Sequence, residues 1–196
     1  MIDSINLDYW KKKNPDVYAW IRIPGTNIDY PILQSSDMEE GYYLTHDIDR
    51  ESNIYGALYT EKYNSRDFRD SNTIIYGHNM NDGSMFGSLK KFIETDYFTK
   101  HDMLTIFTME EKRTYTITAA YRYQAEHLPT YFDFSTKEGT DTYLSEIPGF
   151  VQNTNGNIRS DIEIQAPLLT LSTCTPDNEN MRYLVQAVLV KTEKVS

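Results

Sequence analysis

Short runs of β-branched and aromatic residues, bounded by turn-forming residues, dominate the chain. Runs of this kind are typical of β-strands. They predict about eight strands, over residues 17–23, 27–34, 56–60, 73–76, 103–109, 113–123, 167–174 and 182–190. In the sixth strand the alternation predicts one shared face for Tyr115, Ile117, Ala119, Tyr121 and Tyr123.

Helical spacing of apolar residues occurs between these runs. It predicts a polar helix over residues 4–13, one or two helical turns within 36–44, a helix over 88–98, and a long helical segment over 134–151. Strands dominate and the helices lie between them. The fold class is therefore mostly β with helical insertions, either a mixed β-barrel or a sandwich.

Composition narrows the class of protein. The length of 196 residues fits one domain, 1–196, in which residues 1–14 form an N-terminal helical segment. The apolar fraction of 39% includes 16 Tyr, so tyrosine rings must supply part of the core. The net charge of −10 argues against binding to a nucleic-acid backbone. The sequence contains no run of 18 apolar residues, the length that a membrane-spanning helix needs, and no signal peptide is visible.

Three chemically reactive residue types occur at predicted strand ends. Cys174 closes one strand, Arg182 opens the next, and His78 follows the end of the strand at 73–76. If the last two strands are antiparallel neighbours, Cys174 and Arg182 lie at the same end of the sheet. A thiolate is the reactive nucleophile. A His can donate a proton to a leaving amine, and a guanidinium can stabilise an oxyanion. Ser172 lies on the same strand face as Cys174.

Each of these residues also has an ordinary explanation. A lone Cys in an apolar strand is usually an inert core residue, His78 could cap a turn, and Arg182 could form a surface ion pair. The single Cys excludes an internal disulfide and a multi-thiolate metal site. The four His show no paired ligand spacing, so we expect no metal site.

The local strings resemble one family. Thr170-Leu-Ser-Thr-Cys174, followed by Arg182 and preceded by Tyr76-Gly-His-Asn79, resembles the sortases, and class B most closely. The resemblance covers most of the chain. Residues 17–26 read VYAWIRIPGT and 28–34 read IDYPILQ, which is similar to the first two strands of that family. Residues 56–64, GALYTEKYN, resemble a class B segment that ends in Asn, although the usual Phe and Asp are absent.

This resemblance implies an eight-stranded sortase-type β-barrel with an N-terminal helix and a long helix before the Cys-bearing strand. It implies that Cys174 is the nucleophile, His78 the proton donor and Arg182 the oxyanion stabiliser. The implied substrate-binding positions are Asn64, Ser172 and Thr173.

The implied reaction is transpeptidation at a C-terminal sorting signal, and the resemblance implies that it needs no metal or organic cofactor. Cys174 attacks the Thr carbonyl of a signal similar to Asn-Pro-Gln-Thr-Asn or Pro-x-Thr-Gly, and the thioacyl enzyme is released by a peptidoglycan amine. Sortases are cysteine transpeptidases of Gram-positive bacteria, normally held by an N-terminal membrane helix. The resemblance therefore implies the extracellular face of the membrane and an anchor that is absent from this sequence.

Two alternatives use the same residues differently. A cysteine endopeptidase or hydrolase would pass the acyl group from Cys174 to water. A non-catalytic β-barrel binding module would use a Tyr-rich surface for recognition and would bury Cys174.

Overall fold

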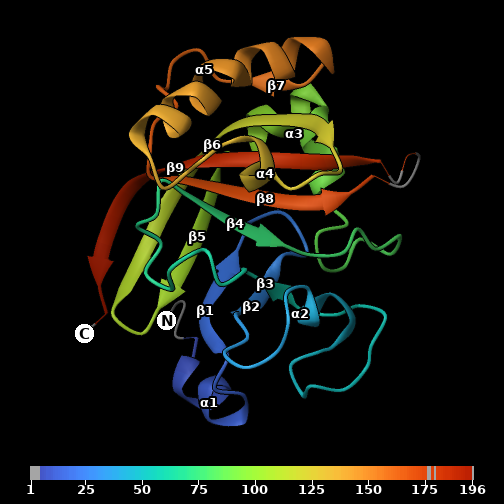
Figure 1. Ribbon diagram of the computed structural model, residues 1–196, viewed down its shortest axis with the longest axis vertical. Helices are drawn as coiled ribbons and strands as arrows, with labels where there is room; N and C mark the ends of the chain where they lie inside the picture. Colours follow the sequence, from blue (N-terminus) through green and yellow to red (C-terminus); the bar gives the residue numbers. More distant parts are fainter. Residues whose placement is uncertain (1–4, 176–177, 179, 196) are drawn as a thin grey trace.

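Eight strands close into a barrel in the computed structural model, which describes residues 5–175, 178 and 180–195. They pair in the order β5-β1-β2-β3-β4-β8-β9-β6, and β6 pairs with β5 to close the sheet (Figure 1). One more short strand is present in the described part of the chain. This strand, β7, pairs with β6 at Ala119 and Ala120 and is not part of the closed barrel. The strands are β1 Val17–Arg22, β2 Asp29–Leu33, β3 Leu58–Tyr59, β4 Asn72–Tyr76, β5 Met103–Thr108, β6 Glu111–Gln124, β7 Asn157–Ile158, β8 Leu168–Cys174 and β9 Met181–Lys194. The predicted eight-stranded barrel is confirmed.

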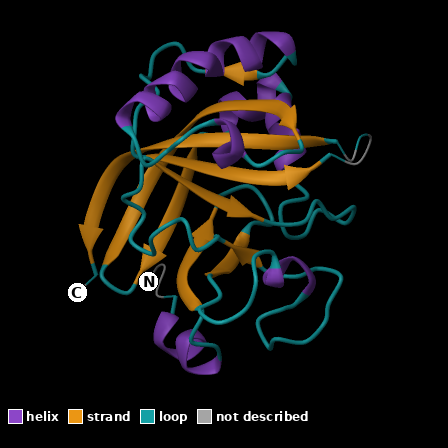
Figure 2. Ribbon diagram, viewed as in Figure 1, coloured by secondary structure: helices purple, strands orange, loops and turns teal. Residues whose placement is uncertain are grey.

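Helices cover the outside of this barrel (Figure 2). They are α1 Leu7–Lys13, α2 Tyr42–Thr45, η1 Leu89–Ile93 (a 3₁₀ helix), α3 Thr95–Lys100, α4 Leu128–Tyr131 and α5 Lys137–Asn153. The long helix before the Cys-bearing strand is α5, and Thr136 caps it by accepting the Gly139 N–H. The N-terminal helix is confirmed from Leu7 onward, while residue 4 lies outside the described residues. Among the described helices, none has the length and apolar character that crossing a membrane requires.

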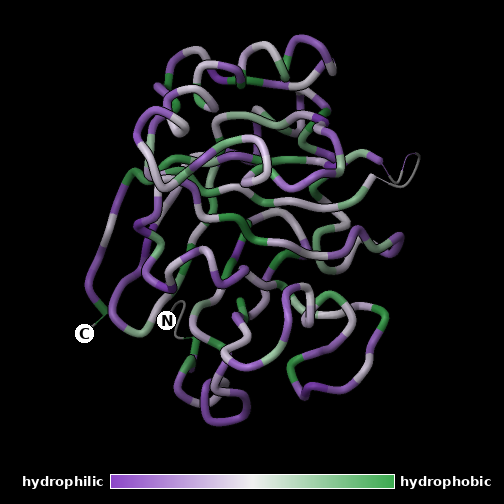
Figure 3. The backbone as a smooth tube through the Cα atoms, in the orientation of Figure 1, coloured by the Kyte–Doolittle hydropathy of each residue, from purple (hydrophilic) through white to green (hydrophobic). Residues whose placement is uncertain are grey.

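Three apolar clusters hold the barrel and its helices together. One fills the interior, one packs α5 against β4, β6, β8 and β9, and one packs α1 and α2 against β1, β2 and β3. In Figure 3 hydrophobic stretches follow the crossing strands, while α1 is largely hydrophilic. The expected tyrosine contribution is confirmed by buried side chains at Tyr18, Tyr43, Tyr59, Tyr115, Tyr121, Tyr123, Tyr143 and Tyr183.

The predicted common face of β6 is wrong. Tyr115 and Ile117 point into the barrel, whereas Tyr121 and Tyr123 pack outside it against α5. The register of β6 against β9 shifts between Ile117 and Ala119. A bulge inserts an extra residue and reverses the facing of every later side chain.

The prediction of a single helix over 88–98 is also wrong. The chain forms two separate helices there, η1 and α3. The side-chain amide of Asn157 donates to the carbonyls of Phe92 and Ile93, at 2.9 and 2.8 Å. Those carbonyls would have to accept backbone N–H groups for the helix to continue. Glu94 between the two helices is extended. Within 36–44, helix begins only at Tyr42.

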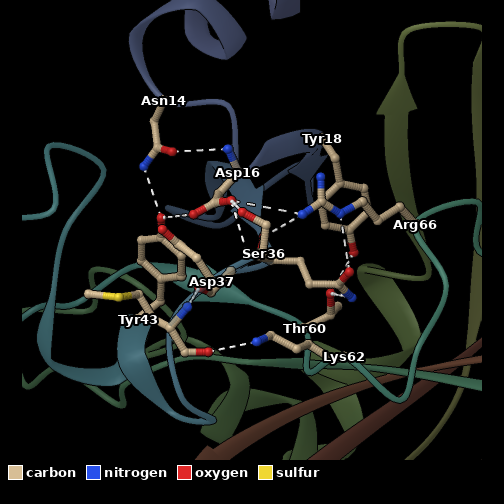
Figure 4. Close-up of polar contacts among 12 residues, drawn as sticks. Asn14, Asp16, Tyr18, Ser36, Asp37, Tyr43, Thr60, Lys62 and Arg66 are labelled. Carbon is tan, nitrogen blue, oxygen red and sulfur yellow. Dashed lines mark hydrogen bonds and ion pairs between the residues drawn. The ribbon is translucent and has the colours of Figure 1, made fainter.

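A buried carboxylate ties α2 to β1 (Figure 4). Asp16, which is 1% exposed, accepts from the Tyr43 hydroxyl at 2.7 Å and from Arg50 Nη2 at 2.8 Å. It also accepts from the backbone N–H and the hydroxyl of Ser36. Asn14 donates to the Tyr43 hydroxyl at 3.0 Å. Burial alone would raise the pKa of Asp16, but the Tyr43 and Ser36 hydrogen bonds and the Arg50 charge outweigh it and lower that pKa.

Asp16→Ala should therefore lower the free energy of unfolding by about 3 kcal/mol, because it leaves buried hydroxyl and guanidinium groups without their acceptor. Asp37→Ala is the matched control, since Asp37 is exposed and lies 3.6 Å from the same Arg50. We expect less than about 1 kcal/mol for that exposed pair. Urea unfolding of both variants measures the difference, and equal losses would contradict the account.

The stabilisation by Asp16 should depend on pH. A carboxyl whose pKa is lowered by folding stabilises the folded state above its ordinary pKa of about 3.9. That stabilisation is lost as pH falls through the lower pKa of the folded state. The stability gap between wild type and Asp16→Ala should thus narrow below about pH 4. A gap that stays constant between pH 7 and the acid limit of folding would contradict this.

Candidate active site

Side chains from β3, β4 and β8 form a row on the outer face of the barrel. Tyr59 pairs with Tyr76, and Tyr76 pairs with Ser172. Directly paired residues on neighbouring strands project to the same face, and so do residues two apart on one strand. Cys174 therefore shares this face with Ser172 and begins a second row, in which it pairs with Arg182 of β9. The predicted meeting of Cys174 and Arg182 at one sheet end is confirmed.

A cavity of about 230 Å³ opens above these rows. Its wall includes Tyr59, Glu61, Tyr76, His127, Cys174 and Arg182. Cys174 is half-buried and is not disulfide-bonded. The binding-module alternative requires this Cys to be buried in the core, and its place in a cavity wall argues against that alternative.

Backbone pairing places His78 beside the end of β8. β4 runs parallel to β8, so both strands end at the same edge of the sheet. The Gly77 N–H donates to the Ser172 carbonyl at 3.2 Å. The Thr173 hydroxyl donates to the Gly77 carbonyl at 2.7 Å. These two bonds fix the residue before His78 against the residues before Cys174.

The imidazole of His78 is oriented by α2. Its Nε2 lies 2.6 Å from the carbonyl oxygen of Leu44. A carbonyl can only accept, so Nε2 carries the proton in this contact and Nδ1 is the nitrogen left for proton exchange. The next residue, Asn79, donates from Nδ2 to the Cys174 carbonyl at 2.8 Å. The segment 77–79 is thus bonded both to β8 and to α2.

Glycine is required before His78 for a packing reason. A Cβ at Gly77 would lie 2.3 Å from Leu58 Cδ2 and 3.0 Å from Phe86 Cδ2. The first approach requires the buried Leu58 side chain to move, and the second is tighter than an ordinary van der Waals contact. Glycine therefore precedes His78 because the backbone at the end of β4 packs directly against side chains of the interior apolar cluster.

The three predicted substrate-binding residues occupy different places. Ser172 lies in the cavity wall. Thr173 is 2% exposed and also borders the cavity, although its hydroxyl is used by Gly77. Asn64 lies in a separate groove, where its amide bonds the backbone of Asn72 and Ile74 at 2.8 and 2.9 Å. Substrate contact by these three residues stays a prediction, and the bonds of Asn64 give it a role in holding β4.

The sequence did not single out four cavity residues. Tyr59 and Tyr76 stack with ring centroids 5.5 Å apart. Tyr76 accepts or donates in two hydroxyl contacts, at 2.6 Å with Tyr63 and at 3.2 Å with His127 Nδ1. Burial raises the pKa of Tyr76 to about 12. Burial also raises the pKa of Glu61, which accepts the Gly41 N–H at 2.8 Å. The strand register brings Tyr59 and Tyr76 together, and loops bring Glu61 and His127 to the same cavity, neither of which sequence periodicity contains.

Comparison with known proteins places the chain in a family. Residues 21–190 match the sortase domain. Sortase B of Listeria monocytogenes is 34% identical over 190 residues, which cover 92% of this chain and 72% of that protein. Sortase B of Staphylococcus aureus is 26% identical over 185 residues, covering 92% of this chain and 73% of that protein.

Solved structures agree with this assignment. Clostridium perfringens sortase B superposes with a TM-score of 0.82 at 31% identity, over 94% of this chain and 99% of that one. A substrate complex of Staphylococcus aureus sortase B gives a TM-score of 0.80 at 26% identity, over 94% of this chain and 84% of that one.

A barrel that presents a thiol, a guanidinium and an imidazole-bearing segment at one end fits a cysteine acyltransferase. The match over residues 21–190 shows that the chain belongs to the sortase family, and its curated relatives are of the sortase B type. It is a cysteine transpeptidase of that type, and the family acts in cell-wall attachment at the Gram-positive cell surface.

Thr173→Val tests whether the bond to Gly77 holds His78 in place. The variant keeps the shape of the side chain and removes the hydroxyl, so it should cost about 1 kcal/mol of stability and about tenfold in turnover, because small displacements of catalytic groups are expensive. Thr118→Val is the matched control. Thr118 is 0% exposed, and its hydroxyl donates to the Gln186 carbonyl at 3.3 Å, away from the cavity.

We expect both variants to lose similar stability in thermal unfolding and only Thr173→Val to lose turnover in a peptide-cleavage assay. Equal turnover in the two variants would show that the bond between Thr173 and Gly77 does not position the imidazole.

Proposed function

We propose that this protein cleaves a C-terminal sorting signal after Thr and transfers the acyl group to a cell-wall amine through a thioacyl intermediate on Cys174. The observation that carries the proposal is the direct pairing of Cys174 with Arg182 in the wall of one cavity. A carbonyl attacked by the thiolate there develops its negative charge beside a guanidinium. Membership of the sortase family supports the same chemistry.

His78 is the proposed proton donor to the departing amine. Its Nε2 is held by the Leu44 carbonyl, so Nδ1 is the nitrogen that exchanges a proton. The thiolate forms a bond to the carbonyl carbon, the oxyanion collapses, and the C–N bond breaks as the amine takes that proton. An incoming amine then attacks the thioester and gives a proton to His78, and Cys174 leaves as the thiolate as the new amide bond forms.

We propose as substrates surface proteins whose signal resembles Asn-Pro-Gln-Thr-Asn or Pro-x-Thr-Gly, with a peptidoglycan amine as the acceptor. Asn64, Ser172 and Thr173 are the proposed substrate-binding positions, of which Ser172 and Thr173 border the cavity. We also propose that residues 1–196 form one catalytic domain, held at the extracellular face of the membrane by an N-terminal anchor. The residues matched to the sortase domain and the family's site of action support this.

Incubation with a panel of such peptides should add the mass of the cleaved acyl fragment to wild-type protein and not to Cys174→Ala. Intact-protein mass spectrometry measures the adduct, and an added amine such as triglycine should discharge it with a new amide product. Discharge to water at the same rate with and without amine would instead identify a hydrolase. A wild-type protein that is folded and forms no adduct with any peptide would contradict the proposal.

Arg182→Lys should lose most of the turnover. A lysine keeps the charge, but it cannot reproduce the directed donors of a guanidinium. Arg22→Lys is the matched control, because Arg22 pairs with Asp29 at 3.1 Å on β1 and β2, away from the cavity. Near-normal turnover in Arg182→Lys would remove Arg182 from the proposed catalytic set.

A further inference from the structure

The hydroxyl of Tyr59 has no hydrogen-bond partner among residues 5–175, 178 and 180–195. Its side chain is nevertheless 5% exposed and lies in the wall of the thiol cavity. The hydroxyl oxygen is not one of the fully buried polar atoms that lack a partner, so it is open to the cavity. A hydroxyl of this kind that borders a cavity can find its partner in a bound molecule.

The strand register directs Tyr59 toward the reacting end of the sheet. It stands in the row with Tyr76 and Ser172, next to the row of Cys174 and Arg182. The backbones of β3 and β8 lie two strand spacings apart, roughly 10 Å. Tyr59 is close enough for the charges of Cys174 and Arg182 to act on its hydroxyl. Both the phenol and the thiol therefore border the space that a bound peptide would occupy.

Tyr76, which stacks on Tyr59, does not have a hydroxyl available for a bound molecule. The Tyr76 hydroxyl is already occupied by Tyr63 and His127. The ring of Tyr76 stacks on Tyr59 at an interplanar angle of 30°, which holds the Tyr59 ring in place. Of the two stacked rings, Tyr59 is the one whose hydroxyl remains available.

Tyr59 also stays a donor at the pH of the reaction. Burial raises its pKa above the ordinary value, and the nearby Glu61 carboxylate raises it further. The phenol thus remains protonated around neutral pH. A protonated phenol can donate to an oxygen that becomes negative during the reaction.

We propose that Tyr59 is a second donor to the oxyanion, acting together with Arg182. This inference rests on the proposed transpeptidation. When the Cys174 thiolate forms its bond to the carbonyl carbon, the π electron pair moves to the carbonyl oxygen. That oxygen accepts from the Arg182 guanidinium and from the Tyr59 hydroxyl. The pair returns as the C–N bond breaks, and the departing amine takes its proton from His78.

Tyr59→Phe is a one-atom test, because the ring and its stacking on Tyr76 are kept. Removal of one oxyanion donor from an enzyme typically costs about 10²–10³ in kcat. We expect kcat for peptide cleavage to fall by at least about tenfold, with KM changed by less than about threefold. The rate at which iodoacetamide alkylates Cys174, and its pH profile, should not change, because the oxyanion is absent from that reaction.

Tyr115→Phe is the matched control. Tyr115 is 2% exposed and its hydroxyl accepts from Arg113 Nε at 3.2 Å, inside the barrel. It should keep kcat and KM near wild type, with thermal unfolding confirming that both variants fold.

Three results would overturn the inference. The first is a kcat for Tyr59→Phe equal to that of Tyr115→Phe. The second is a rise in KM with kcat unchanged, which would mean that Tyr59 binds the ground state only. The third is an altered alkylation profile, which would mean that the hydroxyl serves the thiol. Each requires an active wild type, whereas failure of the proposed function itself would leave the wild type without a thioacyl adduct.

Discussion

The parallel pairing of β4 with β8 is the constraint on which the site depends. These strands are far apart in sequence, yet their ladder ends with the Gly77 N–H on the Ser172 carbonyl. Because parallel strands end at the same edge, the residue after Gly77 emerges beside Cys174. The antiparallel β9 then returns Arg182 to that edge. Backbone hydrogen bonds that fix the ends of three strands thus bring three reactive residue types to one edge of the sheet.

A second support reaches the site from outside the barrel. Asp16 holds Tyr43, and the next residue, Leu44, presents its carbonyl to His78. The buried carboxylate directly before β1 is in this way connected through α2 to the imidazole. Gly56, in the loop between α2 and β3, packs closely against α2. A Cβ at this position would lie 2.5 Å from the Tyr43 carbonyl oxygen. Stability and function are coupled here, since whatever loosens α2 also frees the proposed proton donor.

Sequence patterns predicted the parts of this protein that depend on local chemistry. Strand positions, the long helix and the pairing of Cys174 with Arg182 follow from short apolar runs and a turn-forming link. The bulge in β6 and the break at Glu94 did not follow, because each is imposed by a distant partner. The cavity role of Tyr59 was equally hidden, since it depends on which strand lies beside β3. The strand register and the bonds from Asn157 to the end of η1 are tertiary interactions, which the periodicity of the sequence does not encode.

The most direct test of the central claim is a crystal structure of the protein with a sorting-signal analogue joined to Cys174. The account predicts that the acyl carbonyl oxygen lies within hydrogen-bond distance of the Arg182 guanidinium. It also predicts that the peptide crosses the row of Tyr59 and Ser172, and that His78 Nδ1 faces the position of the leaving amine. A carbonyl oxygen turned away from Arg182, or an imidazole separated from the leaving group by another side chain, would contradict the account.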